Sequence, residues 1–139
     1  MTTAIKLFDH TADLGLECSG ASMADLLERA GEALTGCVVD RSDIRAVEER
    51  VVTAEGHDPE ELLVNFLREL LFLINGEAFL PKRLAVDSIG DRSVSCRVNG
   101  EPRDPQRHTP IREIKAVTYH GVTLEESRGM LTARVVLDV

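Results

Sequence analysis

The sequence is short of the features that mark membrane, secreted and nucleic-acid-coating proteins. Its 139 residues include no Trp, one Tyr and four Phe, so few side chains are available to stack on bases. No segment approaches the roughly 20 consecutive apolar residues that span a bilayer, and no basic region followed by an apolar core opens the chain. We therefore expect a cytoplasmic protein that has no membrane partner.

Cysteine is also scarce. The three cysteines, Cys18, Cys37 and Cys96, are odd in number, far apart and without CxxC spacing, which argues against a disulfide framework. Each lies among apolar positions of a periodic segment, so we expect small buried residues. The four histidines include no pair spaced by four residues and no cysteine partner, which disfavours a zinc site.

Positive charge is the next shortage. The 16 Lys and Arg residues face 24 Asp and Glu residues, and the formal net charge is −8. Phosphate binding needs clustered cations, so we expect no long nucleic-acid surface, and any RNA would be held mainly by a partner. The GxxxxGK[ST], GxGxxG, GxSxG and HExxH signatures are absent from the sequence. What remains possible is a site with oxygen ligands, and such a site suits hard cations such as Ca²⁺, Mg²⁺ or Mn²⁺.

What is present indicates one domain with two helices. A chain of 139 residues fits a single core, so we expect one domain over residues 1–139. Ser22 and Asp25 have nearly the spacing of a capping box at the start of the first helix. Apolar residues then recur at helical spacing as far as Cys37, and Gly36 marks the expected end.

The second helix has clearer signals. Asp58 can cap it, Pro59 suits its first turn, and Glu61 completes a capping box. Asn75-Gly76 marks its end. Its broad apolar face is expected to lie in the core and consists of Leu62, Leu63, Phe66, Leu67, Leu70, Leu71 and Ile74.

The remaining segments alternate with a period of two, which predicts antiparallel strands with one buried face. One strand is expected within residues 47–52, Gly90-Asp91 and Ser127-Arg128-Gly129 mark turns, and Asn99-Gly100 is expected to close a strand. The other alternating positions are Leu14, Leu16, Cys18, Leu84, Val86, Val94, Cys96, Val98, Val117, Tyr119, Val122, Leu124, Leu131, Ala133, Val135 and Leu137. With two helices covering that face, we expect a compact two-layer α+β domain, mostly antiparallel sheet.

Polar side chains concentrate just before the first alternating strand. Asp9, His10, Thr11 and Asp13 place four polar side chains within five positions. They could form a turn in which Asp and Thr satisfy nearby backbone groups, or they could supply ligands for an ion. The residues alone favour the turn.

A second candidate segment is residues 100–121. Its three prolines predict a fixed, irregular loop ahead of a strand. It also carries His108, His120 and the densest cations of the chain, namely Arg103, Arg107, Arg112 and Lys115. A solvated loop and a functional loop both remain open on composition.

The C-terminus places two acidic groups together. If Leu137 points into the core, Asp138 lies on the opposite face of its strand. Because Asp138 is the penultimate residue, its side chain and the free carboxylate of Val139 are close by covalent necessity.

Three blocks of the sequence resemble the archease family. They are residues 8–16 (FDHTADLGL), residues 100–121 (GEPRDPQRHTPIREIKAVTYHG) and the closing run of residues 133–139 (ARVVLDV). The leucine-rich second helix after its acidic cap is also similar to that of the family. The likeness runs from end to end with a matching length.

The resemblance implies the archease fold and a non-catalytic role as activator of the RtcB class of tRNA-splicing RNA ligase. Such an activator promotes guanylylation and multiple turnover of the ligase and broadens its nucleotide use. The resemblance also implies that Asp13, Asp138 and the Val139 carboxylate bind a divalent metal, with calcium preferred over magnesium or manganese. Lys115 and Glu113 of the second block, and His10 of the first, become candidates for activating the partner. RNA would be contacted only through the ligase.

The physical reading agrees with this ligand set. Three negative groups in one small region repel one another, and a hard divalent cation offsets that repulsion. Two other functions stay open. One is a small metal-dependent phosphoester hydrolase in which His10 or His108 acts as base. The other is a chaperone-like modulator of nucleic-acid-processing enzymes.

Overall fold

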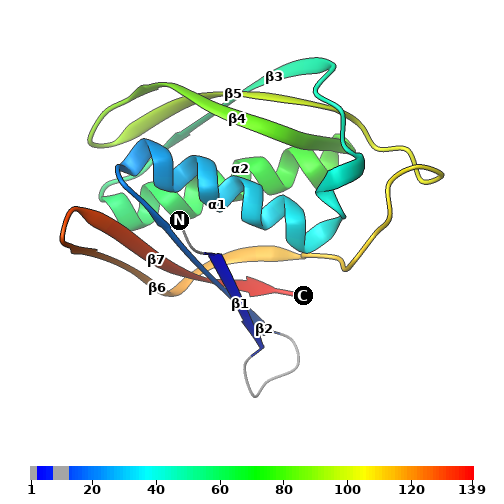
Figure 1. Cartoon of the computed structure of the whole chain (residues 1–139). Helices are drawn as coiled ribbons and strands as arrows, with labels where there is room; N and C mark the ends of the chain where they lie inside the picture. The colour runs from blue at the N-terminus through cyan, green and yellow to red at the C-terminus, as the bar shows by residue number, and fades with distance from the viewer. Residues whose placement is uncertain (1–2, 8–12) are drawn as a thin grey trace.

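Two antiparallel sheets enclose two helices in the computed structural model, which describes residues 3–7 and 13–139 (Figure 1). The sheets have the strand orders β1-β2-β7-β6 and β3-β5-β4. The elements are β1 (Thr3–Leu7), β2 (Asp13–Gly20), α1 (Met23–Val38), the 3-10 helix η1 (Arg41–Asp43), β3 (Glu48–Glu55), α2 (Pro59–Gly76), β4 (Phe79–Ile89), β5 (Ser93–Pro102), β6 (Ala116–Ser127) and β7 (Met130–Asp138). The predicted α+β class with antiparallel strands and two helices is confirmed.

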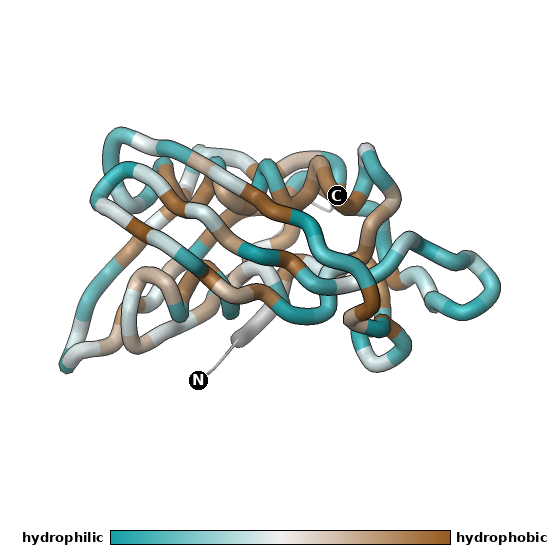
Figure 2. Tube along the Cα trace, turned by 90° about the horizontal axis from the view of Figure 1, so that it is seen from above, coloured by the Kyte–Doolittle hydropathy of each residue, from teal (hydrophilic) through white to brown (hydrophobic). Residues whose placement is uncertain are grey.

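The layering differs from the expectation of two layers. Both α1 and α2 contact strands of both sheets, so the helices form a middle layer with one sheet on each side (Figure 1). Alternation along a strand shows that one face is buried, and it says nothing about which strands share a sheet. The alternation is plainest along β5, where Val94, Cys96 and Val98 are buried and the residues between them are more exposed. Seen from above, the tube carries hydrophilic and hydrophobic stretches in close succession (Figure 2).

Both helices begin at the predicted caps. The Ser22 side chain accepts a hydrogen bond from the Asp25 N–H at 3.1 Å, and Asp25 Oδ2 accepts one from the Ala21 N–H at 3.0 Å. Asp58 caps α2 in the same way, accepting from the Glu61 N–H at 2.8 Å. These bonds satisfy N–H groups that have no partner within the helix. The helix α1 runs two residues beyond Gly36 to Val38, whereas α2 ends at Gly76 as predicted.

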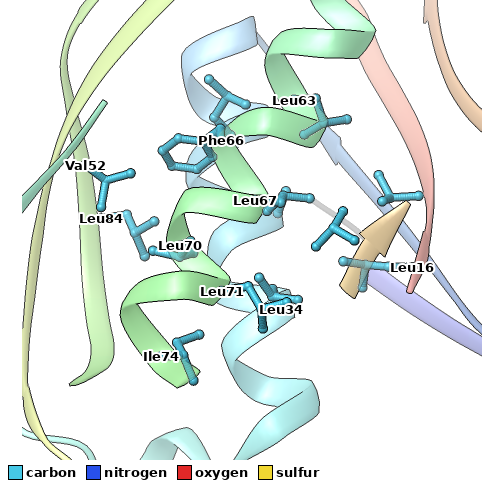
Figure 3. Close-up of a cluster of buried hydrophobic side chains, with 14 of the residues drawn as sticks. Leu16, Leu34, Val52, Leu63, Phe66, Leu67, Leu70, Leu71, Ile74 and Leu84 are labelled. Atoms are coloured by element: carbon cyan, nitrogen blue, oxygen red, sulfur yellow. The ribbon is translucent and has the colours of Figure 1, made fainter. Parts of the chain in front are cut away.

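The apolar face of α2 forms the centre of the core. Phe66 and Leu70 lie on the side of Val52 and Leu84 from the three-stranded sheet, whereas Leu67 and Leu71 lie toward Leu34 of α1 and Leu16 of the four-stranded sheet (Figure 3). All seven predicted core positions of α2 are buried, and Val64 and Leu73 are buried as well. Each such side chain contributes roughly 1.5–3 kcal/mol of burial free energy, so this helix organises both halves of the molecule.

The strand β5 does not end at Gly100 as predicted. It continues to Pro102, with Gly100 paired to Pro81 of β4. A Cβ atom at residue 100 would lie 1.9 Å from the carbonyl oxygen of Leu80, so only glycine permits this close approach of the two backbones. The glycine therefore allows the strand to continue and does not end it.

The three cysteines are buried, as predicted. Burial raises the pKa of the Cys18 thiol to about 12 and that of Cys96 to about 11. Removal from water disfavours a thiolate, so these side chains are suited to packing and not to nucleophilic chemistry. Neither helix of the described ranges is long and apolar enough to cross a membrane.

Candidate metal centre

The start of β2 lies beside the end of β7 in the four-stranded sheet. The register of β2 against β7 places Asp13 directly opposite Asp138, and Ala116 of β6 lies opposite Asp138 on its other side. Residues directly opposite in an antiparallel pair point to the same face, with Cβ atoms roughly 4.5–5.5 Å apart. The first and last residues of this sheet's central pair of strands therefore bring two carboxylates together.

This carboxylate pair, Asp13 and Asp138, lies on the outer face of the sheet. The neighbouring pair, Leu14 and Leu137, points into the core and is buried, with exposures of 1% and 0%. Alternation then directs Asp13 and Asp138 away from the helices, and both are half-buried. The expected parity of Asp138 is confirmed.

Two other outer-face pairs along β2 and β7 are complementary, whereas the carboxylate pair is not. The Ser19 and Thr132 hydroxyls are hydrogen-bonded at 3.1 Å, and Glu17 and Arg134 form an ion pair at 3.9 Å. Like charges placed directly opposite each other are destabilising. At the end of this row the fold holds two negative charges where a complementary pair would be favourable.

The third expected ligand belongs to the same end of the sheet. Val139 follows β7 directly, is half-buried and packs against the core, so its main chain is held next to Asp138. No group of three or more His, Cys, Asp or Glu side chains among residues 13–139 could hold a metal ion. The predicted donor set would be of another kind, with two side chains and the main-chain carboxylate expected at Val139, and oxygen ligands of this type suit a hard cation.

One candidate activation residue, Lys115, lies beside this pair in the folded chain. The Lys115 N–H donates to the Asp138 carbonyl oxygen at 2.7 Å, which fixes the lysine backbone beside the pair. The side chains of Lys115 and Glu113 are exposed, and Lys115 lines a shallow hollow with Arg68 and Phe72 of α2. His10 lies outside the described residues.

A buried cluster that sequence reasoning did not identify holds the loop before Lys115. We call Glu101, Arg107 and His108 the Glu101 cluster. Glu101 is only 5% exposed, and its carboxylate accepts hydrogen bonds from both terminal nitrogens of the Arg107 guanidinium, from the Arg45 N–H at 2.7 Å and from His108 Nε2 at 2.9 Å. The Arg107 guanidinium, with these further bonds, holds the pKa of Glu101 far below its ordinary range.

His108 has no free ring nitrogen. Its Nδ1 accepts from the Asp104 N–H at 2.8 Å, so Nε2 carries the proton and donates to Glu101. The side chain is 1% exposed. This geometry does not fit a general base, and the hydrolase hypothesis loses His108 as a candidate.

The rest of the loop is tied to the helix ends. The Ile111 N–H donates to the Val38 carbonyl oxygen at 2.8 Å, and Asn75 Nδ2 donates to the Ile114 carbonyl oxygen at 2.9 Å. The predicted fixed, irregular loop is confirmed, because residues 103–115 are anchored at several points although they form no long element. The anchored loop leads into β6 and places the Lys115 main chain beside the carboxylate pair, with Glu113 two residues before it.

These features define a class of small α+β domain in which two antiparallel sheets enclose two helices and the start of β2 meets the end of β7 at an acidic pair. Residues 6–139 match the model of the Archease protein family (MTH1598/TM1083). The chain belongs to the archease family, which confirms the resemblance of its three sequence blocks.

Individual relatives agree over nearly the whole length. Protein archease of Pyrococcus abyssi is 34% identical, with 95% of this chain and 96% of the relative covered. A protein named archease-like from Drosophila melanogaster is 33% identical over 86% of this chain and 78% of its own length. The solution structure of Methanobacterium thermoautotrophicum protein 1598 superposes with a TM-score of 0.80 at 32% identity, covering 97% and 98% of the two chains. An archease crystal structure from Thermotoga maritima shares the fold, with a TM-score of 0.65 at 24% identity and 96% of each chain covered.

Proposed function

We propose that this protein is a non-catalytic cofactor that activates an RtcB-type tRNA-splicing RNA ligase in the cytoplasm. It would promote guanylylation and multiple turnover of the ligase and broaden the nucleotides that the ligase accepts. Membership of the archease family supports the proposal. The observation that carries it is the register match of Asp13 with Asp138 at the free C-terminus, beside an exposed lysine.

Asp13, Asp138 and the Val139 carboxylate would hold one divalent cation. All three groups offer hard oxygen donors, and calcium, which accepts flexible oxygen coordination, is preferred over magnesium or manganese. A bound cation supplies charge neutralisation at phosphate oxygens. Two other pairs on the same face support this proposal, because they are complementary, whereas Asp13 has a second carboxylate, Asp138, directly opposite it within the described part of the sheet.

Lys115 and Glu113 would act on the partner and not on this chain's own fold. Lys115 is anchored through its main chain, so its exposed ammonium can meet phosphate or carboxylate groups of the ligase without reordering the backbone. Guanylylation is a nucleotidyl transfer, and such reactions depend mainly on positioning and charge neutralisation. His10 remains a third candidate on the basis of family likeness. RNA would be reached only through the ligase.

A multiple-turnover RNA-joining assay with the ligase of the same organism tests the proposal. The wild-type protein should raise the number of turnovers and the rate of ligase guanylylation. Asp13→Asn and Lys115→Ala should each lose most of that stimulation. Asp91→Asn, an exposed carboxylate in the β4–β5 turn, is the matched control and should retain it. Full stimulation by both site variants would remove the model.

The same preparations separate the two other functions. Metal-dependent hydrolysis of a phosphoester by the purified protein alone would favour a hydrolase, although His108 is unavailable as its base. Binding to the ligase that persists in chelator, without any effect on catalysis, would favour a chaperone-like modulator whose cation only braces the C-terminus.

A further inference from the structure

Beyond its first turn, the exposed stripe of α2 is polar or glycine except at one position. Phe72 is 63% exposed, whereas the other exposed residues of this helix are Pro59 at its start and charged, amide or glycine residues further along. Every other large apolar side chain of α2 faces the core. Phe72 therefore offers an apolar contact surface on a polar helical stripe next to the candidate site.

The Phe72 ring rests against Gly76. A Cβ atom added at residue 76 would lie 3.0 Å from a ring carbon, so the glycine leaves room for the ring to lie along the helix surface. The ring borders the hollow that Arg68 and Lys115 also line. The Arg68 Nε donates to the Val117 carbonyl oxygen at 2.9 Å, which orients the guanidinium beside the ring.

A second hollow continues this surface toward the loop. It shares Asn75 with the first and is lined by Arg103, Arg112 and Ile111, whose side chain is 51% exposed. Among the described residues that line the two hollows there are four cations and one carboxylate, Glu113. The whole chain has the opposite balance, with 16 basic against 24 acidic residues. We call these two hollows, with Phe72 and Ile111, the basic face.

We propose that the basic face docks an acidic segment of the RtcB-type ligase that also carries apolar side chains. The inference rests on the proposed function, because it names the surface through which that partner is held. Charge complementarity defines the occupant, since local cations on an acidic protein select a negatively charged partner. Phe72 and Ile111 provide the apolar contacts, and exposed aromatic residues at the centre of such patches are often binding hot spots.

The face is continuous with the candidate metal centre. Lys115 lines the first hollow through its side chain, and its N–H donates to the Asp138 carbonyl oxygen at 2.7 Å. A partner segment seated against Phe72 would therefore bring the ligase alongside the carboxylate pair. Docking and activation become two functions of adjoining surfaces at one end of the molecule.

RNA fits the basic face less well than a protein segment. One aromatic ring and one aliphatic side chain offer little stacking surface, whereas single-stranded RNA is held by several stacked bases. Arg68 and Arg112 each donate to a main-chain carbonyl oxygen, at 2.9 and 3.0 Å, so part of their hydrogen-bonding capacity is committed within this chain.

Equilibrium binding to the purified ligase tests the proposal with two independent variants. Phe72→Ser should weaken binding roughly tenfold or more, as expected for a hot spot. Arg103→Glu should weaken binding at low ionic strength and flatten its salt dependence. The matched controls lie on the three-stranded sheet. Val51→Ser replaces a side chain that is also 63% exposed, and Arg83→Glu reverses an exposed charge. Both controls should bind like the wild-type protein.

The outcomes distinguish the docking surface from the function. If the wild-type protein binds and stimulates the ligase, and both face variants bind equally well, the docking proposal is overturned while the proposed function stands. If the wild-type protein neither binds nor stimulates the ligase, both are overturned. Tight binding of the wild-type protein to a single-stranded RNA probe, lost in Phe72→Ser, would assign the face to nucleic acid instead. Thermal unfolding of each variant confirms that it is folded.

Discussion

Two polar clusters of this protein come from different blocks of the family sequence and have opposite electrostatics. In the Glu101 cluster a buried carboxylate meets a guanidinium, an imidazole N–H and a backbone N–H. In the carboxylate pair Asp13 faces Asp138, with no opposite charge directly across the strands. The Glu101 carboxylate finds its hydrogen-bond partners within the chain, so the Glu101 cluster stabilises the fold. The second costs stability unless something is added, which is the character expected of a binding site.

Substitutions in the two clusters should therefore change the free energy of unfolding in opposite directions. The largest change is expected for the Glu101 cluster. Replacing Glu101 by Gln removes the negative charge while Arg107 and His108 stay in place. Breaking a buried, hydrogen-bonded ion pair at one partner costs about 3 kcal/mol. The free energy of unfolding from denaturant titration should fall by that order, and Glu113→Gln, an exposed carboxylate on the same loop, should change little. Equal stability of the two variants would show that the Glu101 cluster does not hold the fold.

Lowering the pH should remove the stabilisation by the Glu101 carboxylate without any substitution. The folded-state pKa of Glu101 lies below the ordinary value of 4.5, because Arg107 and its other donors favour the carboxylate. The stabilisation is therefore fully present above about pH 4.5 and is lost as the pH falls below that value. The stability difference between wild type and Glu101→Gln, measured by denaturant titration at a series of pH values, should shrink on acidification. A difference that stays constant down to low pH would contradict the assignment.

Local signals explain which parts of the fold were predictable. Helix starts depend on residues within one turn, and Ser22 and Asp58 cap the helices as their spacing predicts. The end of β5 was predicted wrongly at Gly100, because the role of this glycine depends on its close contact with the Leu80 carbonyl oxygen of another strand. The second sheet was missed for a similar reason. Period-two alternation is a property of one strand, whereas sheet membership depends on pairings between distant segments.

The same distinction applies to the candidate site. Strand parity was enough to place Asp138 on the outer face, since it requires only that Leu137 be buried. The Glu101 cluster was missed because His108 looks the same in sequence whether it is a surface base or a buried donor. The spacing of Glu101 and His108 carries no sign of the loop that brings them together.

Blocking the carboxylate expected at Val139 tests whether a cation completes the carboxylate pair. A short C-terminal extension converts the Val139 carboxylate into a peptide group and leaves both aspartates in place. Calcium should stabilise the wild-type protein by roughly 2–3 kcal/mol when its concentration is about 100 times Kd, and the extended chain should lose most of that gain. Thermal unfolding with and without calcium, and calorimetric titration, measure the effect. An N-terminal extension of equal length is the control, and equal calcium affinity of both extended chains would exclude Val139 as a ligand.

The smallest expected effect is a gain in stability on substitution and not a loss. Asp13→Asn relieves the repulsion with Asp138, so in chelator the variant should be more stable than the wild-type protein by about 0.5 kcal/mol. Glu17→Gln, on the same strand and face, removes one ion-pair partner of Arg134 and should instead destabilise slightly, within the few tenths of a kcal/mol typical of exposed ion pairs. Adding calcium should reverse the order of wild type and Asp13→Asn, because only the wild-type protein keeps its full set of ligands. Denaturant titrations of the three proteins in chelator and in calcium measure both signs. If Asp13→Asn destabilises the protein in chelator as Glu17→Gln does, the carboxylates already have compensating partners within the fold, and the reason for placing a cation between them is lost.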